Sequence, residues 1–312
     1  MTFAPPAALA RRFGPSLRGD EPLGQHTSFR IGGPADWFVS AKTRDDIVDA
    51  ILAATADGLS WLVLGRGSNV LIDELGVRGL VIRNDANGFT LDRESGAVRC
   101  DSGARLPSVG AQSAKAGLAG LEWAVGIPGS VGGGVVMNAG AQGGSIADVL
   151  VAGEVFQAGR RVTCSAGEFQ HAYRTSRLQR ECGIVVLGAE FQLSLGSPPD
   201  SLARVQAFRR HRQETQPTDP GAGSIFRNPP GHSAGGLIDQ AGLKGTRVGG
   251  ALISPKHGNF IVNVGGATTA DVRALISLAR ETVSERFGVE LATEVELIGP
   301  TGRVTLHEPG RQ

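Results

Sequence analysis

The sequence predicts an α+β fold, and three observations lead to that class. Short apolar runs such as 61–64 and 260–264 are typical of strands in a buried sheet. Segments with apolar residues at helical spacing are interspersed with them, most clearly after Thr268. Between such elements lies the stretch 126–134, in which five of nine residues are glycine and which cannot build a core of its own.

The size and composition are those of an ordinary globular protein. The chain has 312 residues, which suggests two or three domains, and it is 41% hydrophobic and 20% charged. The net charge of +1 does not indicate a nucleic-acid surface. We see no secretory signal and no apolar run of about 18 residues, so we expect a cytoplasmic protein without a membrane span. Cys100, Cys164 and Cys182 fit no metal or disulfide spacing, and we expect no metal site.

The first quarter of the chain reads as a lead-in followed by strands and one helix. Residues 1–22 look irregular or partly helical, 32–34 form a turn and 37–39 form a strand. Thr43 and Asp46 have the spacing of a capping box, which predicts a helix with an apolar face extending to Leu52.

The strand 61–64 leads into a glycine loop, 65–71. This loop begins like the dinucleotide fingerprint G-x-G-x-x-G, but Val70 replaces the third glycine and no convincing helix follows. We therefore reject the Rossmann interpretation. Two interpretations remain for the loop: a tight turn, or a phosphate loop in which Ser68 and Asn69 are side-chain donors. The stretch 126–134 is open to the same two interpretations.

The middle of the chain is rich in short strands. Ser165 and Glu168 are spaced as a helix cap, and a helix is expected over 106–116. The predicted strands are 80–82, 89–91, 97–100, 149–151, 154–156, 161–163, 184–187 and 190–193.

A boundary is expected at 196–199, where the composition changes. The helix after it has Leu202, Val205 and Phe208 on one face and a basic run, 209–212, which we interpret as a solvent-exposed face. We then predict a loop at 223–230, a short helix at 236–239, a strand at 260–264 and a long helix from the Thr268 cap to Gly288.

The last predicted strand is 289–298. Val289, Leu291, Val295 and Leu297 alternate onto one face, and Glu290, Glu294 and Glu296 fall on the other. Glu294 is therefore expected to point away from the apolar face.

Seven motifs in this order resemble the UDP-N-acetylenolpyruvoylglucosamine reductase family, over about residues 27–298. They are 27–33 (TSFRIGG), 64–69 (LGRGSN), 126–133 (GIPGSVGG), 173–176 (YRTS), 222–229 (AGSIFRNP), 242–245 (GLKG) and 294–295 (EV). The resemblance implies an FAD-binding domain of the vanillyl-alcohol-oxidase type in two subdomains, 1–75 and 76–197. A substrate-binding domain, 198–312, would follow, with the last strand contributing Glu294 to the active site.

The resemblance also implies a reaction. NADPH would reduce noncovalently bound FAD, and hydride would then pass to the enolpyruvyl ether of a UDP-sugar, giving UDP-N-acetylmuramate for peptidoglycan. Three residues match the catalytic ones of the family. Arg174 would bind the substrate carboxylate, Ser224 would protonate the carbanion, and a protonated Glu294 would help to polarise the carboxylate.

Further matches imply binding roles. The residues expected to bind the substrate are Tyr173, Arg227 and Asn228. Those expected to bind FAD are Arg30, Gly32, Gly65, Arg66, Gly67, Ser68, Asn69, Val70, Gly126, Ile127, Gly129, Ser130, Gly132, Gly133 and Asn138.

The chain departs from the family pattern in three places. Only 50 residues separate Arg174 from Ser224, so it resembles the short-loop branch and lacks the tyrosine that folds over the substrate in the other branch. Ala292 stands where the family usually has a second glutamate, and Arg227 where it often has lysine. We expect a monomer.

Two alternatives stay open at this point. One is a flavoprotein oxidase of the same fold, but its usual covalent FAD link needs a His or Cys, and neither occurs in 65–71 or 126–134. The other is a non-catalytic flavin-binding protein, against which the presence of Arg174, Ser224 and Glu294 argues.

Overall fold

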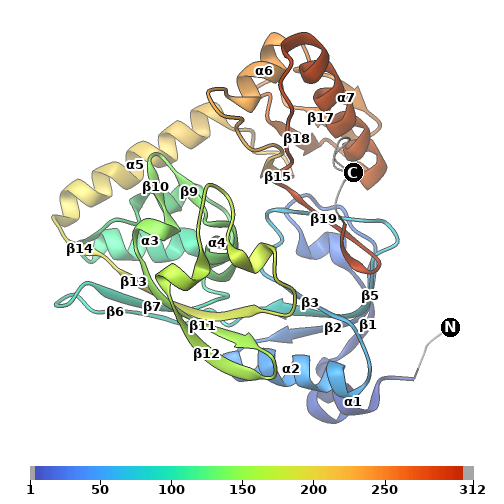
Figure 1. Cartoon of the computed structure of the whole chain (residues 1–312), viewed down its shortest axis with the longest axis vertical. Helices are drawn as coiled ribbons and strands as arrows, with labels where there is room; N and C mark the ends of the chain where they lie inside the picture. Colours follow the sequence, from blue (N-terminus) through green and yellow to red (C-terminus); the bar gives the residue numbers. More distant parts are fainter. Residues whose placement is uncertain (1–3, 305–312) are drawn as a thin grey trace.

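The first sheet is mostly parallel, and a capped helix connects two of its strands. The computed structural model describes residues 4–304. The sheet has the order β1 (Arg18–Pro22), β2 (Pro34–Ala41), β5 (Val77–Asn84) and β3 (Trp61–Leu64), in which only β1 is antiparallel to its neighbour. Helices α1 (Ala7–Phe13) and α2 (Arg44–Ala56) pack together below it (Figure 1). The predicted capping box is present, since the Thr43 hydroxyl accepts from the Asp46 N–H at 3.0 Å.

The first sheet extends past residue 75. Strand β5 pairs in parallel with both β2 and β3, because the turn at Gly76 returns the chain to the sheet that it has just left. The division into 1–75, 76–197 and 198–312 stays a prediction; by sheet membership, the change from the first unit to the second comes after Asn84.

The second sheet has the order β12 (Arg160–Ser165), β11 (Leu150–Gln157), β13 (Val185–Gln192), β7 (Ala97–Asp101) and β6 (Phe89–Leu91). We predicted two separate strands in place of β11 and two in place of β13, and both predictions were wrong. Gly153 and Gly188 interrupt the apolar pattern, but the ladder between the two strands continues through them.

Helices cover one face of this second sheet (Figure 1). They are α3 (Leu106–Lys115) and α4 (Val131–Met137), while the long α5 (Pro198–Thr215) packs outside them on α3 and on the 3-10 helix Glu122–Gly126. Helix α4 begins inside the glycine stretch, which we did not predict because glycine disfavours helix interiors. Close packing explains it: an added Cβ at Gly132 would lie 2.9 Å from Ser102 Cβ. Helix α5 is anchored on this unit by Ser201 Oγ, which donates to Glu122 at 2.8 Å.

Short elements connect these parts. They are the 3-10 helices Gly14–Ser16, Leu23–His26, Glu122–Gly126 (η3), Ile146–Asp148, Ala166–Phe169 and Arg177–Gln179 (η6), and the short strands β8 (Leu118–Ala119), β9 (Gly140–Ala141), β10 (Gly144–Ser145) and β14 (Ser194–Leu195).

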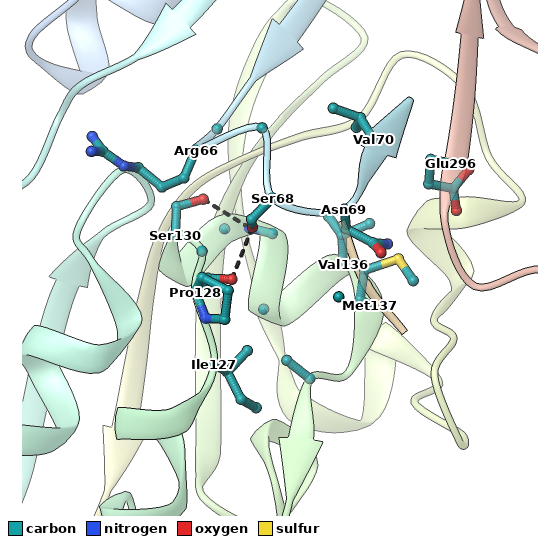
Figure 2. Close-up of a pocket in the computed structure, with 18 of the residues that line it drawn as sticks. Arg66, Ser68, Asn69, Val70, Ile127, Pro128, Ser130, Val136, Met137 and Glu296 are labelled. Carbon is teal, nitrogen blue, oxygen red and sulfur yellow. Dashed lines mark hydrogen bonds between the residues drawn. The ribbon is translucent and has the colours of Figure 1, made fainter. Parts of the chain in front are cut away.

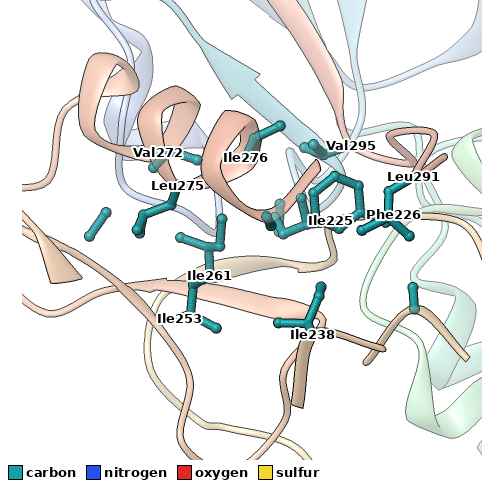
Figure 3. Packing of buried hydrophobic residues seen from close by; sticks show 14 of the residues in the cluster. Ile225, Phe226, Ile238, Ile253, Ile261, Val272, Leu275, Ile276, Leu291 and Val295 are labelled. Atoms are coloured by element: carbon teal, nitrogen blue, oxygen red, sulfur yellow. The ribbon is translucent and has the colours of Figure 1, made fainter. Parts of the chain in front are cut away.

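The third sheet has the order β15 (Gly221–Ser224), β18 (Phe260–Asn263), β17 (Ala251–Ile253) and β16 (Arg247–Val248), with α6 (Ala234–Gln240) and α7 (Thr269–Phe287) packed beside it. The Thr268 capping box starts α7, and Gly288 ends it with a φ of 64°. Figure 3 shows the core between α7 and the sheet, where Leu275 lies near Ile261 of β18, and Ile225 and Phe226 belong to the same cluster.

The strand predicted at 289–298 is much shorter in the structure. Strand β19 covers only Glu296–Gly299 and pairs with β4 (Val70–Ile72) and β20 (Gly302–Val304). Residues 289–295 do alternate between buried and more exposed positions. Their backbone hydrogen bonds, however, are made with the irregular 225–227 segment and not with a strand. The Glu294 N–H, for example, donates to the Ile225 carbonyl at 2.8 Å.

Candidate active site

A cavity of about 550 Å³ is formed where the three units meet. Its walls come from the glycine loop before β4, from η3 to β9, from the segment after Ala172, from the end of α5 with β15, and from β19 with β20. Figure 2 shows the region of the two glycine loops. The shape of the cavity depends on the hydrogen bonds of these loops and on their glycines, which have no side chains.

The two glycine loops contact each other through positions without side chains. A Cβ at Gly65 would lie 2.6 Å from Ser130 Oγ, and a Cβ at Gly129 would lie 3.2 Å from Ser68 Oγ. Ser68 Oγ donates to the Pro128 carbonyl at 2.8 Å, which joins the loops directly (Figure 2). Glycine is needed here because a serine side chain of the other loop approaches the backbone closely.

At residues that line the cavity, both loops contain backbone N–H groups without protein acceptors in the described part of the chain. Within residues 4–304, the backbone N–H groups of 66–69, Gly129 and Ser130 donate to no protein acceptor. Clustered N–H groups without acceptors form a concave site for an anion. The donor set therefore fits a pyrophosphate, whose oxygens only accept hydrogen bonds.

Gly67 is the position where the loop tolerates substitution least. Its φ is 63°, and a Cβ there would lie 2.2 Å from the His26 carbonyl oxygen. We expect Gly67→Ala to lower the free energy of unfolding by about 1–2 kcal/mol for the left-handed backbone. Overpacking against His26 adds about 1–3 kcal/mol.

The matched control is Gly58→Ala, which has a φ of 71° and no atom within 4 Å of the added Cβ. Denaturant unfolding should show a smaller loss for Gly58→Ala than for Gly67→Ala. Equal losses would show that close packing at Gly67 contributes nothing.

Most of the predicted FAD-binding residues line the cavity. Three of the predicted residues, Arg30, Gly32 and Asn138, do not line it. Arg30 is exposed, and Gly32 packs against Ile72, whose Cβ would lie 3.0 Å from a Cβ at Gly32. Those that do line it are Gly65, Arg66, Gly67, Ser68, Asn69, Val70, Gly126, Ile127, Gly129, Ser130, Gly132 and Gly133.

The 27–33 motif supports the first glycine loop from behind. Ser28 Oγ is placed to donate to the carbonyls of Gly221, at 2.7 Å, and Gly67, at 3.2 Å. Ser28 thereby connects the loop to β15, which carries Ser224. We did not predict this role, because nothing in the sequence places residue 28 beside residue 221.

Asn69 connects the same loop to Glu294. Its side-chain amide donates to the Glu294 carbonyl at 3.1 Å, and its own carbonyl accepts from the Glu296 N–H at 3.0 Å. The side-chain amide of Asn69 thus binds the backbone of Glu294, whose side chain lies in the site.

Arg174 occupies a strained turn at the cavity wall. Ala172 and Thr175 exchange backbone hydrogen bonds across the turn, and Arg174 has a φ of 54°. A non-glycine residue in this region costs of order 1–3 kcal/mol. Asn138 holds the turn, because its Nδ2 donates to the Ala172 carbonyl at 2.9 Å. Asn138 is therefore placed to position Arg174.

Arg174 and Glu294 form an ion pair in the cavity. Arg174 Nε lies 3.2 Å from Glu294 Oε1, and each side chain is about one-fifth exposed. Burial raises the pKa of Glu294, and the nearby positive charges of Arg174 and Arg227 only partly oppose this. A carboxyl with a raised pKa beside a cation is a candidate functional group.

Ser224 completes a group of three side chains from distant segments. It lies at the end of β15 opposite Phe260 and lines the cavity with Arg174 and Glu294. Within residues 4–304, its hydroxyl makes no hydrogen bond to protein. The structure thus brings all three predicted catalytic residues to one cavity and leaves the hydroxyl free for a ligand.

The three predicted substrate-binding residues lie outside the cavity walls. Tyr173 is more than half exposed, and its ring lies 5.1 Å from the Arg174 guanidinium carbon. The Nε atom of Arg227 is buried without a partner. Asn228 Oδ1 accepts from the Ala234 N–H at 3.0 Å, at the start of α6. Their contact with substrate stays a prediction.

Two features of the cavity were missed. We predicted that the whole basic run faces solvent. Arg212 instead lines the cavity and donates to the Gly126 carbonyl. Glu296 and Arg303 form a second ion pair in the wall, and Arg303 also donates to the Gln179 carbonyl at 2.8 Å. An apolar-pattern analysis treats both sites as polar surface, so only the tertiary structure reveals them.

Comparison with known proteins agrees with this geometry. Residues 35–165 match the family model of an FAD binding domain, and residues 216–298 match the C-terminal domain of UDP-N-acetylenolpyruvoylglucosamine reductase. A reductase of that name from Bacillus anthracis is 45% identical over 282 residues, which are 90% of this chain and 94% of the relative. The chain belongs to the UDP-N-acetylenolpyruvoylglucosamine reductase family.

Other members of the family support the same conclusion. A reductase from Symbiobacterium thermophilum is 46% identical over 288 residues, covering 91% of this chain and 92% of the relative. The crystal structure of the Thermus caldophilus reductase superimposes with a TM-score of 0.78 at 39% identity, covering 90% of this chain and 99% of that one.

Three predictions are thereby confirmed. The chain has the α+β fold of the family with an FAD-binding domain, it is an oxidoreductase, and its cofactor is FAD. Noncovalent attachment of the FAD stays a prediction. Within residues 4–304, no helix combines the length and apolar character needed to cross a membrane.

Proposed function

We propose that this protein uses NADPH to reduce UDP-N-acetylglucosamine enolpyruvate to UDP-N-acetylmuramate, a precursor of peptidoglycan. The names of its relatives and the arrangement of Arg174, Ser224 and Glu294 in one cavity support this proposal. A cytoplasmic location and a monomeric state remain predictions. Bound FAD would accept hydride from NADPH and pass it on to the substrate.

The protein would hold FAD through its two glycine loops. The free N–H groups of 66–69, Gly129 and Ser130 suit the pyrophosphate. Ser68 and Ser130 fix the spacing of the loops and so the width of this donor set. The fixed donors need no rearrangement when the anion binds, which reduces the entropic cost of binding.

Arg174 and Glu294 would bind the carboxylate of the enolpyruvyl group. Hydride addition at the methylene carbon leaves negative charge on the neighbouring carbon and, by conjugation, on the carboxylate. A planar guanidinium suits a carboxylate, and a protonated Glu294 adds one donor. The turn strain at Arg174 is an observable sign of an imposed orientation.

Ser224 would supply the proton that completes the addition. Its hydroxyl transfers a proton to the carbon that carries the negative charge, and solvent then restores the hydroxyl. The observation that carries the proposal is this hydroxyl, which has no protein partner in residues 4–304 and lines the same cavity as the Arg174–Glu294 pair. The test is NADPH oxidation that depends on the enolpyruvyl sugar nucleotide.

The raised pKa of Glu294 predicts a pH dependence. Glu294 donates a hydrogen bond only when protonated, so flavin reoxidation by the sugar nucleotide should slow as pH rises through its raised pKa. Glu294→Gln keeps a donor that does not titrate, so its rate should be flatter on that limb. Single-turnover rates at a series of pH values measure this. A limb unchanged in Glu294→Gln would exclude Glu294 as its source.

The same group links folding to pH. Because the folded state holds the proton of Glu294 more tightly than the unfolded chain, the stability contributed by this group falls as pH rises through the interval above the ordinary glutamate pKa. Glu294→Gln should remove that part of the pH dependence of unfolding.

A further inference from the structure

Asn259 lies at the end of the ladder between β15 and β18. The last paired residues of that ladder are Ser224 and Phe260, and the Ile225 N–H then donates to the Asn259 carbonyl at 2.9 Å. Strand β18 begins at Phe260, so Phe226, the next residue of the other segment, lies past the end of this ladder.

The side chain of Asn259 continues the pairing that the strand does not. Its Oδ1 accepts from the Phe226 N–H at 2.9 Å, and its Nδ2 donates to the Phe226 carbonyl at 2.8 Å. A carboxamide has a donor and an acceptor, as a peptide group has, so it can bind both backbone groups of one residue. Asn259 is only 4% exposed, and leaving these backbone groups unpaired at a buried position costs free energy.

Packing on the other side holds Asn259 in place. Its own N–H donates to His257 Nδ1 at 3.2 Å. An added Cβ at Gly235 of α6 would lie 3.5 Å from Asn259 Cβ and 2.9 Å from His257 Cε1. The glycine lets α6 approach closely, so the amide of Asn259 lies between α6 and Phe226.

The segment that Asn259 binds is connected to two of the three candidate catalytic residues. Ser224 precedes Phe226 by two residues and lines the cavity. The Ile225 carbonyl, which lies between them, accepts from the Glu294 N–H at 2.8 Å. A shift of Phe226 would therefore move the hydroxyl of Ser224 and the backbone that carries the carboxyl of Glu294.

We propose that Asn259 is a positioning residue that fixes Ser224 and Glu294 relative to each other. This inference rests on the proposed function. Asn259 does not line the cavity, so it acts through the backbone of 225–226 and needs no contact with substrate or cofactor. It would serve the second half of the reaction, in which both residues take part, and not the reduction of FAD by NADPH.

The test is Asn259→Asp, compared with wild type by stopped-flow absorbance of the flavin in both half-reactions. A carboxylate keeps an acceptor for the Phe226 N–H but has no donor for the Phe226 carbonyl. We expect reoxidation by the enolpyruvyl sugar nucleotide to slow by about 10–100-fold, because small misplacements of reacting groups have large effects on rate. The reduction of FAD by NADPH should be almost unchanged.

The same variant gives a pH readout that a general loss of structure would not produce. Protonation of the new carboxyl restores a donor, so the ratio of wild-type to Asn259→Asp reoxidation rates should increase as pH rises. The charged and titratable groups nearby are His257 with Lys244, and Glu294 with Arg227. They are the same in both proteins, so their own titration largely cancels in the ratio. A ratio that does not change with pH would show that the lost donor is not the cause.

The matched control is Asn263→Asp, at the other end of β18. The Asn263 amide donates to the Phe29 carbonyl at 3.1 Å, and its Oδ1 accepts from the N–H groups of Gly265 and Ala267. This control loses a donor of the same kind without changing the bonds of 224–227. Urea should unfold it more easily than wild type, but reoxidation should keep the wild-type rate.

If Asn259→Asp does not fold, Asn259→Ser carries the measurement. Its shorter side chain cannot reach both backbone groups of Phe226, so reoxidation should again slow while the reduction of FAD stays almost unchanged.

Three further results would overturn the inference. One is an equal loss in both half-reactions of Asn259→Asp, which would indicate a changed cavity. Another is lowered stability with both rates unchanged, which would make Asn259 a purely structural residue. The third is an equally slow reoxidation in Asn263→Asp. If the enolpyruvyl sugar nucleotide does not reoxidise the flavin of the wild-type protein, the proposed function itself is contradicted, so the two failures are distinguishable.

Discussion

Ser224→Ala is expected to slow the reoxidation of reduced FAD by the enolpyruvyl sugar nucleotide by about 10²–10⁴-fold, the contribution typical of general acid catalysis. The reduction of FAD by NADPH should be almost unchanged, because the hydroxyl has no part in that step. Stopped-flow absorbance of the flavin measures both rates. Folding should be little affected, since within residues 4–304 the hydroxyl forms no hydrogen bond that alanine would remove.

Ser224→Cys is the matched variant, because a thiol of similar size can also give up a proton. It should be faster than Ser224→Ala in the second half-reaction. A loss of equal size in both half-reactions would count against Ser224 as the proton donor, and it would point to a changed cavity shape around β15.

Arg174→Met is expected to lower kcat for the sugar nucleotide by about 10²–10³-fold, as when a donor to developing negative charge is removed. The side chain fills similar space but provides neither charge nor donors. Arg174→Lys should restore part of the rate, since lysine keeps the charge and loses the planar pair of donors. Steady-state and single-turnover kinetics measure the effect.

Removing Arg174 also leaves the buried Glu294 without its cation, so the double variant with Glu294→Gln separates the two effects. The coupling between the two substitutions should be large, because the side chains are only 3.2 Å apart. A variant with a raised KM and an unchanged kcat would show that Arg174 binds ground state and transition state equally, contrary to the proposed role.

The parts of the fold that depend on local chemistry could be predicted from the sequence. The capping boxes at Thr43 and Thr268 start α2 and α7 where they were expected, because cap and first turn lie within four residues of each other. Strand 289–298 could not be predicted correctly. Its alternation is real, but its backbone partners are in the 225–227 segment, and residue spacing carries no information about them.

The candidate site depends even more on distant contacts. Arg174 and Glu294 are 120 residues apart, and no periodicity relates them. Only the resemblance of their motifs to one family predicted that they act together. The roles of Ser28, Asn69 and Arg212 were missed, because each is defined by a backbone carbonyl that approaches in the folded chain.

The most direct test of the proposed function is an anaerobic flavin experiment with the purified wild-type protein. NADPH should bleach the bound FAD, and UDP-N-acetylglucosamine enolpyruvate should then restore its colour with formation of one UDP-N-acetylmuramate per flavin. UDP-N-acetylglucosamine, which lacks the enolpyruvyl group, should leave the flavin bleached. If the enolpyruvyl sugar nucleotide also leaves the flavin bleached while oxygen restores its colour, the proposed function is wrong.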